Sequence, residues 1–297
     1  MTLTTKERKD PSKMAEGIAM HRFKESQKPE GERLCYDPYA IHFITPAILE
    51  FAARHPAEAN AMVERMERRF PGLSSSILAR VRYFDDFVLQ SLAEGLEQLV
   101  ILGAGYDTRA YRIEGLREQV RVFEVDHPET QSVKREKVRE LFGSLPEHVV
   151  YVPLDLETGD LGRELTGNGY NPDKQTLFIL EGLVMYIPPH AVDEILAFIR
   201  NTSAPGSAVI FDYYPSSVVD GTCDREIAQN IRTYVAQLGE PLRFGIPEGT
   251  AEAFLSERGF CNVVNVTNED YKKLYFNGKN ENREVCSALY FAHGMVE

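Results

Sequence analysis

The stretch LVILGAGYDTRAYR, residues 99–112, decides the fold of this chain. Its four apolar residues predict a buried strand that leads directly into Gly103-Ala104-Gly105. The two glycines allow a sharp turn and let a ligand approach the backbone where a Cβ would collide. Asp126 closes the next predicted strand, 21 residues after Gly105, where a carboxylate can accept hydrogen bonds from both hydroxyls of a ribose. The stretch therefore predicts a site for an adenosine cofactor.

The third glycine of the dinucleotide fingerprint G-x-G-x-x-G is missing, because the run continues as Tyr106-Asp107-Thr108. Its absence weakens the case for a nicotinamide cofactor and favours one without a pyrophosphate, and S-adenosyl-L-methionine fits that description. A nicotinamide oxidoreductase would also need a catalytic Tyr-x-x-x-Lys or an equivalent, which we do not find in the sequence.

Length and composition describe a globular protein with a large core. The chain has 297 residues, of which 43% are hydrophobic, enough for one elaborated α/β domain or a domain with a helical cap. No apolar run reaches the roughly 18 residues of a membrane span. The first residues, MTLTTKERKDPSK, lack the apolar core of a secretory signal. We therefore expect a cytoplasmic protein that does not span a membrane.

Charge and cysteine usage exclude several classes of partner. A formal net charge of −12 repels a polyanion, so a nucleic-acid substrate is disfavoured. The seven histidines are scattered without metal-ligand spacing, and we predict no metal site. The cysteines are far apart, with no C-x-x-C, and read as reduced structural thiols: Cys35, Cys223, Cys261 and Cys286.

Strand-like and helix-like segments alternate from about Gly95 onward, which predicts a parallel sheet covered on both faces. The stretch from Asn268 to Asn282, between the last two predicted strands, is polar and shows no convincing helix. A parallel crossover normally uses a helix, so we expect the final strand to insert antiparallel. The predicted class is α/β, a Rossmann-like, mostly parallel sheet of seven strands at residues 98–103, 120–125, 148–153, 176–181, 207–212, 261–266 and 285–291.

Helix signals lie between these strands. Pro128 begins a helix that ends at Gly143, and Pro188-Pro189 begin another. Residues 1–95 are expected to form an N-terminal helical cap, and residues 96–297 the cofactor-binding domain. In the cap, two helices carry apolar stripes made of Met62, Val63 and Met66, and of Ile77, Val81, Phe84, Val88 and Leu92.

Arg80 lies about 60° from the centre of the second stripe, at the edge of the face expected to be buried. A buried guanidinium needs an anionic partner. The alternative is an arginine that extends its charged end to solvent.

Six blocks in sequence order resemble class I S-adenosyl-L-methionine-dependent methyltransferases. More narrowly, the chain resembles the leucine carboxyl methyltransferase family with its bacterial and polyketide-tailoring relatives. The resemblance covers about residues 20–215. Its blocks are Asp37-Pro38-Tyr39, Ala79-Arg80-Val81-Arg82, the run from Leu102 to Arg109, the run from Phe123 to Pro128, the run from Val152 to Leu156, and the run from Glu181 to Tyr186.

The resemblance implies roles for residues around the cofactor. Arg80 would pair with the methionyl carboxylate, a contact that a bidentate guanidinium holds well. Gly103, Ala104 and Gly105 would form the cofactor turn. Asp126 would hold the ribose, although an aspartate that caps the following helix is compatible with the same position.

Three further positions complete the expected cofactor site. The resemblance implies that Asp155 and Leu156 flank the adenine, and the alternative for Asp155 is a carboxylate that caps its own loop. Glu181 ends the fourth predicted strand, where doubly wound sheets bind ligands. A carboxylate there could face the α-amino group or the sulfonium of the cofactor.

The acceptor side of the site is less defined by the sequence. Tyr186 precedes Pro188-Pro189 and could line the transfer site, with His190 close enough to be considered as a base. A packed aromatic is the alternative for Tyr186. The loop at Tyr213-Tyr214 could form a substrate wall. The position that is a lysine in some family members falls near His21-Arg22 here. The resemblance therefore does not assign the contact that the N-terminal segment would make with the cofactor carboxylate or the substrate.

The leading hypothesis is an O-methyltransferase for a carboxylate on a small organic acid or a peptide C-terminus, because a carboxylate is already ionised at pH 7 and needs no base. The alternatives are a phenol or alcohol acceptor and a non-catalytic module that binds the cofactor. A nucleic-acid base methyltransferase would need an Asn/Asp-Pro-Pro-Tyr/Phe motif where Glu181-Gly182-Leu183 stand. The net charge of −12 opposes an RNA substrate further, but some family relatives modify the side chain of a tRNA base, so RNA stays an improbable alternative. The sequence does not define an oligomeric state.

Overall fold

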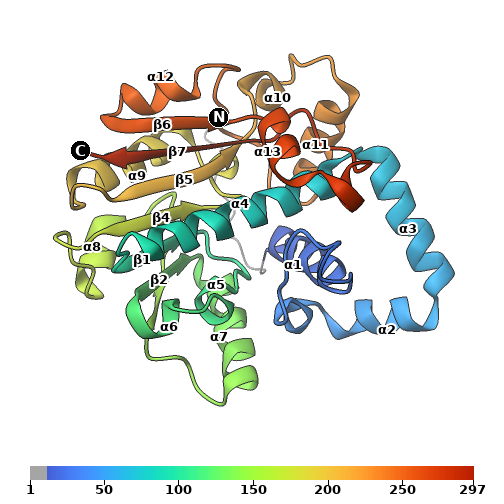
Figure 1. Ribbon diagram of the computed structural model, residues 1–297, viewed down its shortest axis with the longest axis horizontal. Coiled ribbons are helices and arrows are strands. Elements are labelled where there is room, and N and C mark those ends of the chain that lie inside the picture. The colour runs from blue at the N-terminus through green and yellow to red at the C-terminus, as the bar shows by residue number, and fades with distance from the viewer. Residues whose placement is uncertain (1–11) are drawn as a thin grey trace, which may run out of the picture.

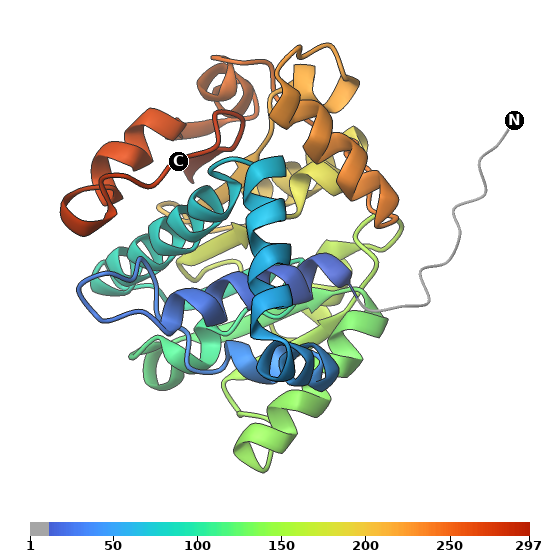
Figure 2. The same ribbon diagram turned by 90° about the vertical axis from the view of Figure 1, so that its right-hand side faces the viewer.

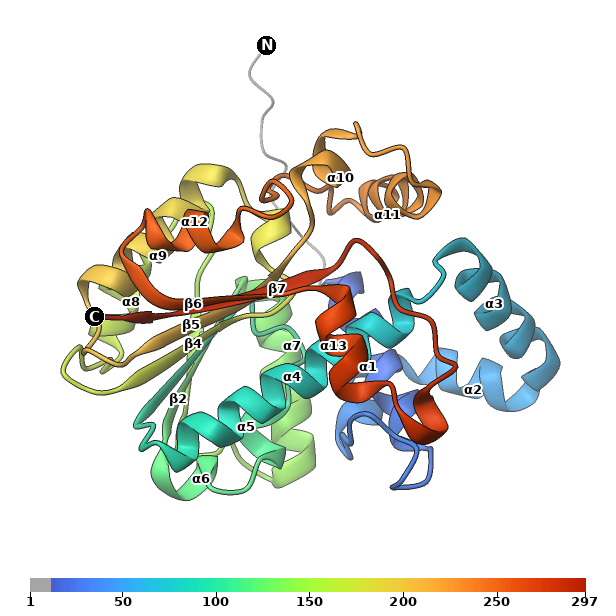
Figure 3. The ribbon, with the colours of Figure 1, turned by 45° about the horizontal axis from the view of Figure 1, so that its top comes forward.

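A computed structural model describes residues 12–297 of the chain. Seven strands form one sheet in the order β3-β2-β1-β4-β5-β7-β6 (Figures 1 and 3). The first five strands are parallel, and β7 is antiparallel to both of its neighbours. The strands are β1 (Gln98–Leu102), β2 (Arg121–Asp126), β3 (Val149–Pro153), β4 (Thr176–Leu180), β5 (Ala208–Tyr213), β6 (Phe260–Val266) and β7 (Tyr290–Val296).

The expected α/β class and the antiparallel last strand are thus confirmed, but the bounds of that strand are wrong. The predicted strand at residues 285–291 pairs only from Tyr290 onward. Val285 to Leu289 precede the strand, because the main-chain carbonyls of Cys286 and Leu289 accept hydrogen bonds from the Tyr271 hydroxyl at 3.1 and 3.2 Å.

Both faces of the sheet are covered by helices. Alternate residues of each strand face opposite sides, so Leu99 and Ile101 join one core while Val100 and Leu102 join the other. The helices that follow β1 are α5 (Arg109–Arg112), α6 (Leu116–Gln119), α7 (Pro128–Phe142), α8 (Leu161–Gly167), α9 (Pro189–Asn201), α10 (Ser216–Asp220), α11 (Glu226–Gln237), α12 (Ala251–Ser256) and α13 (Asn268–Tyr275), with 3-10 turns η2 (Val184–Tyr186) and η3 (Gly278–Asn280).

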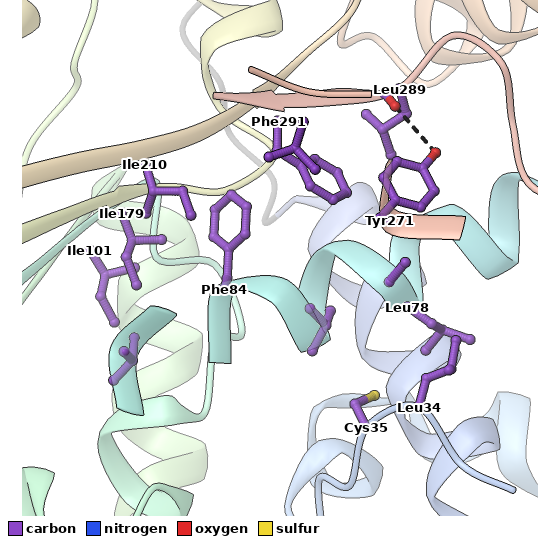
Figure 4. Packing of buried hydrophobic residues seen from close by; sticks show 14 of the residues in the cluster. Leu34, Cys35, Leu78, Phe84, Ile101, Ile179, Ile210, Tyr271, Leu289 and Phe291 are labelled. Atoms are coloured by element: carbon purple, nitrogen blue, oxygen red, sulfur yellow. Dashed lines mark hydrogen bonds between the residues drawn. The ribbon is translucent and has the colours of Figure 1, made fainter. Parts of the chain in front are cut away.

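Helix α13 corrects the prediction that residues 268–282 hold no helix. Thr267 and Asp270 form a capping box, in which the Thr267 hydroxyl accepts from the Asp270 amide and the Asp270 carboxylate accepts from the Thr267 amide. Tyr271 on α13 is fully buried and stacks on Phe291 of β7, with ring centroids 4.9 Å apart (Figure 4). The helix is only eight residues long, and of its apolar residues Tyr271 alone is fully buried while Leu274 is 55% exposed, so the sequence gives a weak helix signal.

Residues 12–95 contain helices and no strand. Their elements are α1 (Lys13–Ser26), η1 (Ala40–Phe43), α2 (Pro46–Arg54), α3 (Pro56–Arg69) and α4 (Leu73–Ala93). Helix α4 crosses one face of the sheet, with Phe84 packed toward Ile101, Ile179 and Ile210 (Figure 4). The division into residues 1–95 and 96–297 stays a prediction.

Helices α2 and α3 stand away from the sheet (Figures 1 and 3). Neither helix buries a residue, and Met62, Val63 and Met66 are 51%, 37% and 40% exposed. The apolar stripe expected on α3 therefore exists, but it faces solvent. No helix among residues 12–297 is long and apolar enough to cross a membrane.

Candidate active site

The glycine turn and Asp126 meet at the carboxyl ends of β1 and β2. Gly103 and Gly105 have φ of +65° and +43°, a left-handed conformation that side chains rarely adopt. One oxygen of Asp126 accepts a hydrogen bond from the Gly105 amide, and the other accepts one from the His127 amide at 2.6 Å. The structure thus brings Gly103, Ala104, Gly105 and Asp126 together, and two backbone donors orient the carboxylate.

A buried ion-pair network lies at the ends of β4 and β5. The Arg80 guanidinium donates to Glu181 Oε1 at 3.0 Å and to Asp212 Oδ2 at 2.6 Å. Asp212 also accepts a hydrogen bond from the Gly182 amide at 2.6 Å. Arg80 is 5% exposed, so it does not extend to solvent, and its anionic partners come from the protein itself. Burial opposes its charge, but Asp212 and Glu181 raise the pKa of Arg80 above its ordinary value.

Sequence reasoning missed Asp212. Burial raises the pKa of this carboxyl, although the charge of Arg80 and the hydrogen bond from Gly182 act against that rise. The available signal was its position: Asp212 lies near the end of β5 as Glu181 lies just past the end of β4, on neighbouring parallel strands. The carboxyl ends of such strands form one edge of the sheet.

Arg109 provides a second buried cation that sequence reasoning left out. Its guanidinium lies 2.6 Å from Glu181 and 2.7 Å from Asp85, and it also pairs with Asp107. Glu181 is therefore held between Arg80 and Arg109. Burial acts against ionisation of Asp107, but the charges of Arg109 and Lys134 outweigh it and lower the pKa of Asp107 to about 2.

Two further contacts hold the glycine turn from both sides. On α1, the Arg22 guanidinium donates to the Tyr106 carbonyl at 2.5 Å and to Asp37 at 2.8 Å, which links the Asp37-Pro38-Tyr39 block to the turn. On α7, the ammonium of Lys134 donates to the Ala104 carbonyl at 3.4 Å and pairs with Glu124 at 2.8 Å. Both cations are buried, so the turn is fixed before any ligand binds.

Asp155 and Leu156 follow β3 at the same edge of the sheet. The Asp155 carboxylate accepts hydrogen bonds from the Glu157 amide at 2.9 Å and from the Thr158 hydroxyl at 3.1 Å. Asp155 therefore caps its own turn, as the structural alternative expected. Contact of Asp155 and Leu156 with adenine stays a prediction.

The acceptor-side residues separate in the structure. Tyr186 is partly buried at the end of η2. Burial, followed by the charges of Glu240 and Asp212, raises its pKa above the ordinary value. His190 is exposed on the first turn of α9, and within residues 12–297 no hydrogen bond or ion pair joins it to Tyr186. The structure thus does not pair the two residues that the sequence put forward for the transfer site.

The two adjacent tyrosines at the end of β5, Tyr213 and Tyr214, also separate. Tyr213 packs in the core on the side of α9 and α12, and its hydroxyl donates to Asn265 at 2.8 Å. Tyr214 is buried in the core on the opposite side of the sheet. Burial is the largest cause that raises its pKa, and the charges of Tyr186 and Asp212 add to the rise. Only Tyr214 therefore borders the ion-pair network.

The donor set suits a ligand with an amino-acid end and a ribose. Arg80 can pair with a carboxylate, Glu181 and Asp212 with an ammonium, and Asp126 with hydroxyl groups. A Cβ added at Gly103 would lie 3.0 Å from the Leu183 side chain, and the φ of +65° strains any larger residue at this position. No group of His, Cys, Asp and Glu within residues 12–297 is arranged to hold a metal ion.

Comparison with known proteins agrees with this geometry. A family model described as leucine carboxyl methyltransferase matches residues 15–200. The chain is 27% identical over 257 residues to the "Putative S-adenosyl-L-methionine-dependent methyltransferase YktD" of Bacillus subtilis, which covers 86% of this chain and 82% of that protein. It is 34% identical over 212 residues to a "Putative S-adenosyl-L-methionine-dependent methyltransferase" of Mycobacterium avium, with 70% and 69% covered.

Two solved structures share the fold. One is described as a putative methyltransferase from Thermobifida fusca, with a TM-score of 0.58, 16% identity, and 80% of this chain and 88% of that chain covered. The other is a DUF574 family protein from Streptomyces avermitilis, with a TM-score of 0.57, 15% identity, and 94% and 97% covered. At these identities the likeness concerns the fold alone.

Proposed function

This chain belongs to the leucine carboxyl methyltransferase family and is an S-adenosyl-L-methionine-dependent methyltransferase, and we propose that it is an O-methyltransferase whose acceptor is a carboxylate. The acceptor would be a small organic acid or the C-terminus of a peptide. One feature of the site supports this choice: burial raises the pKa of Tyr186 and Tyr214, the tyrosines near Arg80 and Asp212, and His190 is exposed. A site built this way suits an oxygen that is ionised before it arrives.

The proposed cofactor site uses the residues at the ends of β1 to β5. Arg80 would pair with the methionyl carboxylate, while Glu181 and Asp212 would face the amino group. Asp126 would accept from the ribose hydroxyls, and Asp155 with Leu156 would flank the adenine. The observation that supports this assignment is that a buried guanidinium, Arg80, lies between two carboxylates, Glu181 and Asp212, so both charges of an amino-acid group can find a partner.

When bound, S-adenosyl-L-methionine supplies a methyl group that an acceptor oxygen displaces from the sulfonium, so the chain has mainly to position the two partners. The protonated hydroxyls of Tyr186 and Tyr214 can donate hydrogen bonds to an acceptor oxygen. Neither can take up a proton. The rigid glycine turn, held by Arg22 and Lys134, keeps the cofactor side fixed while the acceptor enters.

The test incubates the enzyme with methyl-labelled cofactor and a panel of carboxylic and phenolic acceptors. A carboxylate acceptor gives a methyl ester, which releases volatile labelled methanol in mild base. The rate should stay nearly flat from about pH 6 to 9, since the acceptor is ionised throughout. Base-stable label with a rate that climbs about tenfold per pH unit would contradict the proposal and identify a hydroxyl acceptor.

A further inference from the structure

Residues 240–246, between α11 and α12, run from one face of the sheet to the other. Leu242 packs against the core on the side of α4, whereas Phe244 and Ile246 are buried in the core on the opposite side. The two helices that this segment joins lie well apart in Figure 3. We call residues 240–246 the strap, because the segment passes over an edge of the sheet.

The strap lies on the loops that follow β4 and β5. The Met185 carbonyl in η2 accepts hydrogen bonds from the main-chain amides of residues 243–244, at 2.8 and 3.4 Å. The Ile246 amide donates to the Tyr214 carbonyl at 3.2 Å, directly after β5. The edge that the strap crosses is therefore the carboxyl edge of the sheet, beside the loop that carries Tyr186.

One side chain of the strap reaches a third loop, the turn after β3. The Arg243 guanidinium donates to Glu157 Oε1 at 2.6 Å. The Glu157 amide donates to the Asp155 carboxylate at 2.9 Å, so Glu157 belongs to the turn proposed to hold the adenine. Arg243 thus contacts two loops at once, because its main chain binds Met185 after β4 and its side chain binds the turn after β3.

The first residue of the strap contacts the start of α1. The Glu240 carboxylate accepts a hydrogen bond from the Ser12 hydroxyl at 3.1 Å, and the Ser12 amide donates to the Thr130 hydroxyl of α7 at 3.2 Å. Figure 2 shows the start of α1, in dark blue, between the end of α11 and α7. Burial is the largest cause that raises the pKa of Tyr186, and the charge of Glu240 adds to that rise. This end of the strap therefore lies near Tyr186 as well as α1.

The contact between Arg243 and Glu157 is a partly exposed ion pair. The two side chains are 35% and 29% exposed, and water weakens such an attraction, so the pair contributes little stability by itself. Phe244 and Ile246, which anchor the strap, are 8% and 0% exposed. The pair can therefore open while the anchored end stays in place, and a ligand that orders the turn after β3 favours the closed pair.

We propose that the strap forms the outer wall of the acceptor site and that Arg243 is a positioning residue, which transmits adenine binding at the Asp155 turn to the loop that carries Tyr186. The inference rests on the proposed placement of the adenine at Asp155 and Leu156, and it holds for any class of acceptor. Arg243 acts without touching either ligand, since it already contacts both loops. The acceptor side is completed only when the cofactor is bound.

The experiment measures hydrogen exchange of the full chain with and without S-adenosylhomocysteine. The reporting amides are those of residues 243–244, which bond to Met185, and that of Glu157, which bonds to Asp155. Arg243→Met removes the charge, and Arg243→Lys keeps it. The matched control is Arg258→Met, because the Arg258 side chain is 30% exposed and pairs with Asp193 at 2.8 Å.

In the wild type, S-adenosylhomocysteine should slow exchange at residue 157 and also at residues 243–244, the latter roughly threefold to tenfold. Arg243→Met should keep the slowing at residue 157 and lose it at residues 243–244. Arg243→Lys should restore it in part, and Arg258→Met should behave as the wild type. If residue 157 responds and residues 243–244 do not, or if Arg243→Met keeps both responses, the inference falls and the placement of the adenine stands. If residue 157 does not respond, that placement fails and the inference fails with it.

A second measurement approaches the same pair from the other side. Calorimetry with S-adenosylhomocysteine compares Arg243→Met, Glu157→Gln and the double variant. Each single change should raise Kd roughly twofold to fivefold, and the double variant should be no weaker than the single variants, because both changes remove one pair. Losses that add in the double variant would contradict the inference.

Discussion

Arg80 on α4 and Asp212 on β5 form a salt bridge of 2.6 Å in which the carboxylate side chain is 0% exposed. The two residues are 132 positions apart, so the pair ties the helical part of the chain to the fifth strand. A buried pair of this kind contributes little net stability when intact, because desolvation offsets the attraction. Removing one partner is costly, since the other charge is left buried and unpaired.

Arg80→Ala should therefore affect both stability and binding. It leaves Asp212 and Glu181 without this cation, and we expect a loss of about 3–5 kcal/mol in the free energy of unfolding. Cofactor affinity should fall roughly tenfold to a hundredfold. Urea unfolding and calorimetry measure the two effects. Arg82→Ala is the control, because Arg82 is exposed and pairs only with Asp86 at 2.8 Å among the carboxylates of the described residues. Equal losses in the two variants would contradict the prediction.

Asp126→Ala should weaken cofactor binding roughly tenfold to a hundredfold, because it removes a charged acceptor at the ribose position. It also frees the Gly105 amide, so the turn should loosen. Asp160→Ala is the control: Asp160 caps α8 by accepting from the Arg163 amide at 2.9 Å. That change should cost about 1 kcal/mol of stability and leave calorimetric cofactor affinity unchanged. Wild-type affinity in a folded Asp126→Ala protein would remove this residue from the site.

Gly105→Val should be the most damaging change in the turn. Its φ of +43° is unfavourable for a β-branched residue, and the new side chain would meet Ala15, whose Cβ lies 3.3 Å from the position of an added Cβ. We expect lower stability and loss of cofactor binding. Gly167→Ala at the end of α8, where an added Cβ meets nothing within 4 Å, should be neutral. Thermal melts with and without S-adenosylhomocysteine distinguish the two.

Acid should destabilise the fold through two half-buried histidines. Burial is the largest cause that lowers the pKa of both His21 and His293 from 6.5 to about 4. As pH falls from 6.5 to 4, the unfolded chain takes up protons that the folded chain does not, so stability falls in that window. Each histidine accounts for up to roughly 3 kcal/mol, less where water reaches the ring.

Urea unfolding at pH 7.5, 5.5 and 4.5 measures this dependence. His293→Gln should flatten it, because glutamine does not titrate, whereas the exposed His190→Gln should leave the slope unchanged. Between about pH 4 and 2 a further loss should come from Asp107, whose pKa of about 2 lies below its ordinary value. A slope that His293→Gln leaves intact would assign the acid sensitivity to other groups.

The strands were predictable because each is an apolar run next to a turn signal. β1 to β6 lie within one residue of their predicted bounds at each end. The predicted start of β7 is too early because Val285 to Leu289 are apolar except for Ser287, and only the tertiary contact with Tyr271 shows that they do not pair. Helix α13 was missed because it is only eight residues long and its clearest sequence signal is the Thr267 capping box.

For the site, the sequence predicted the individual side chains better than their partners. The need of Arg80 for an anion followed from its place on α4, and the structure meets that need with Glu181 and Asp212. Which carboxylates approach it depends on the order of β4 and β5 in the sheet. His190 is the converse case: it lies four residues from Tyr186 in the sequence, but it is exposed on α9 and does not pair with Tyr186.

The position of β7 has a consequence for how the protein is made. This strand lies between β5 and β6, yet it is the last of the seven to leave the ribosome. Until residues 290–296 emerge, β5 and β6 each present an open edge, and such edges pair readily with other chains. A nascent chain that stalls before Tyr290 is therefore prone to aggregate, and chaperone protection matters most during that interval of translation.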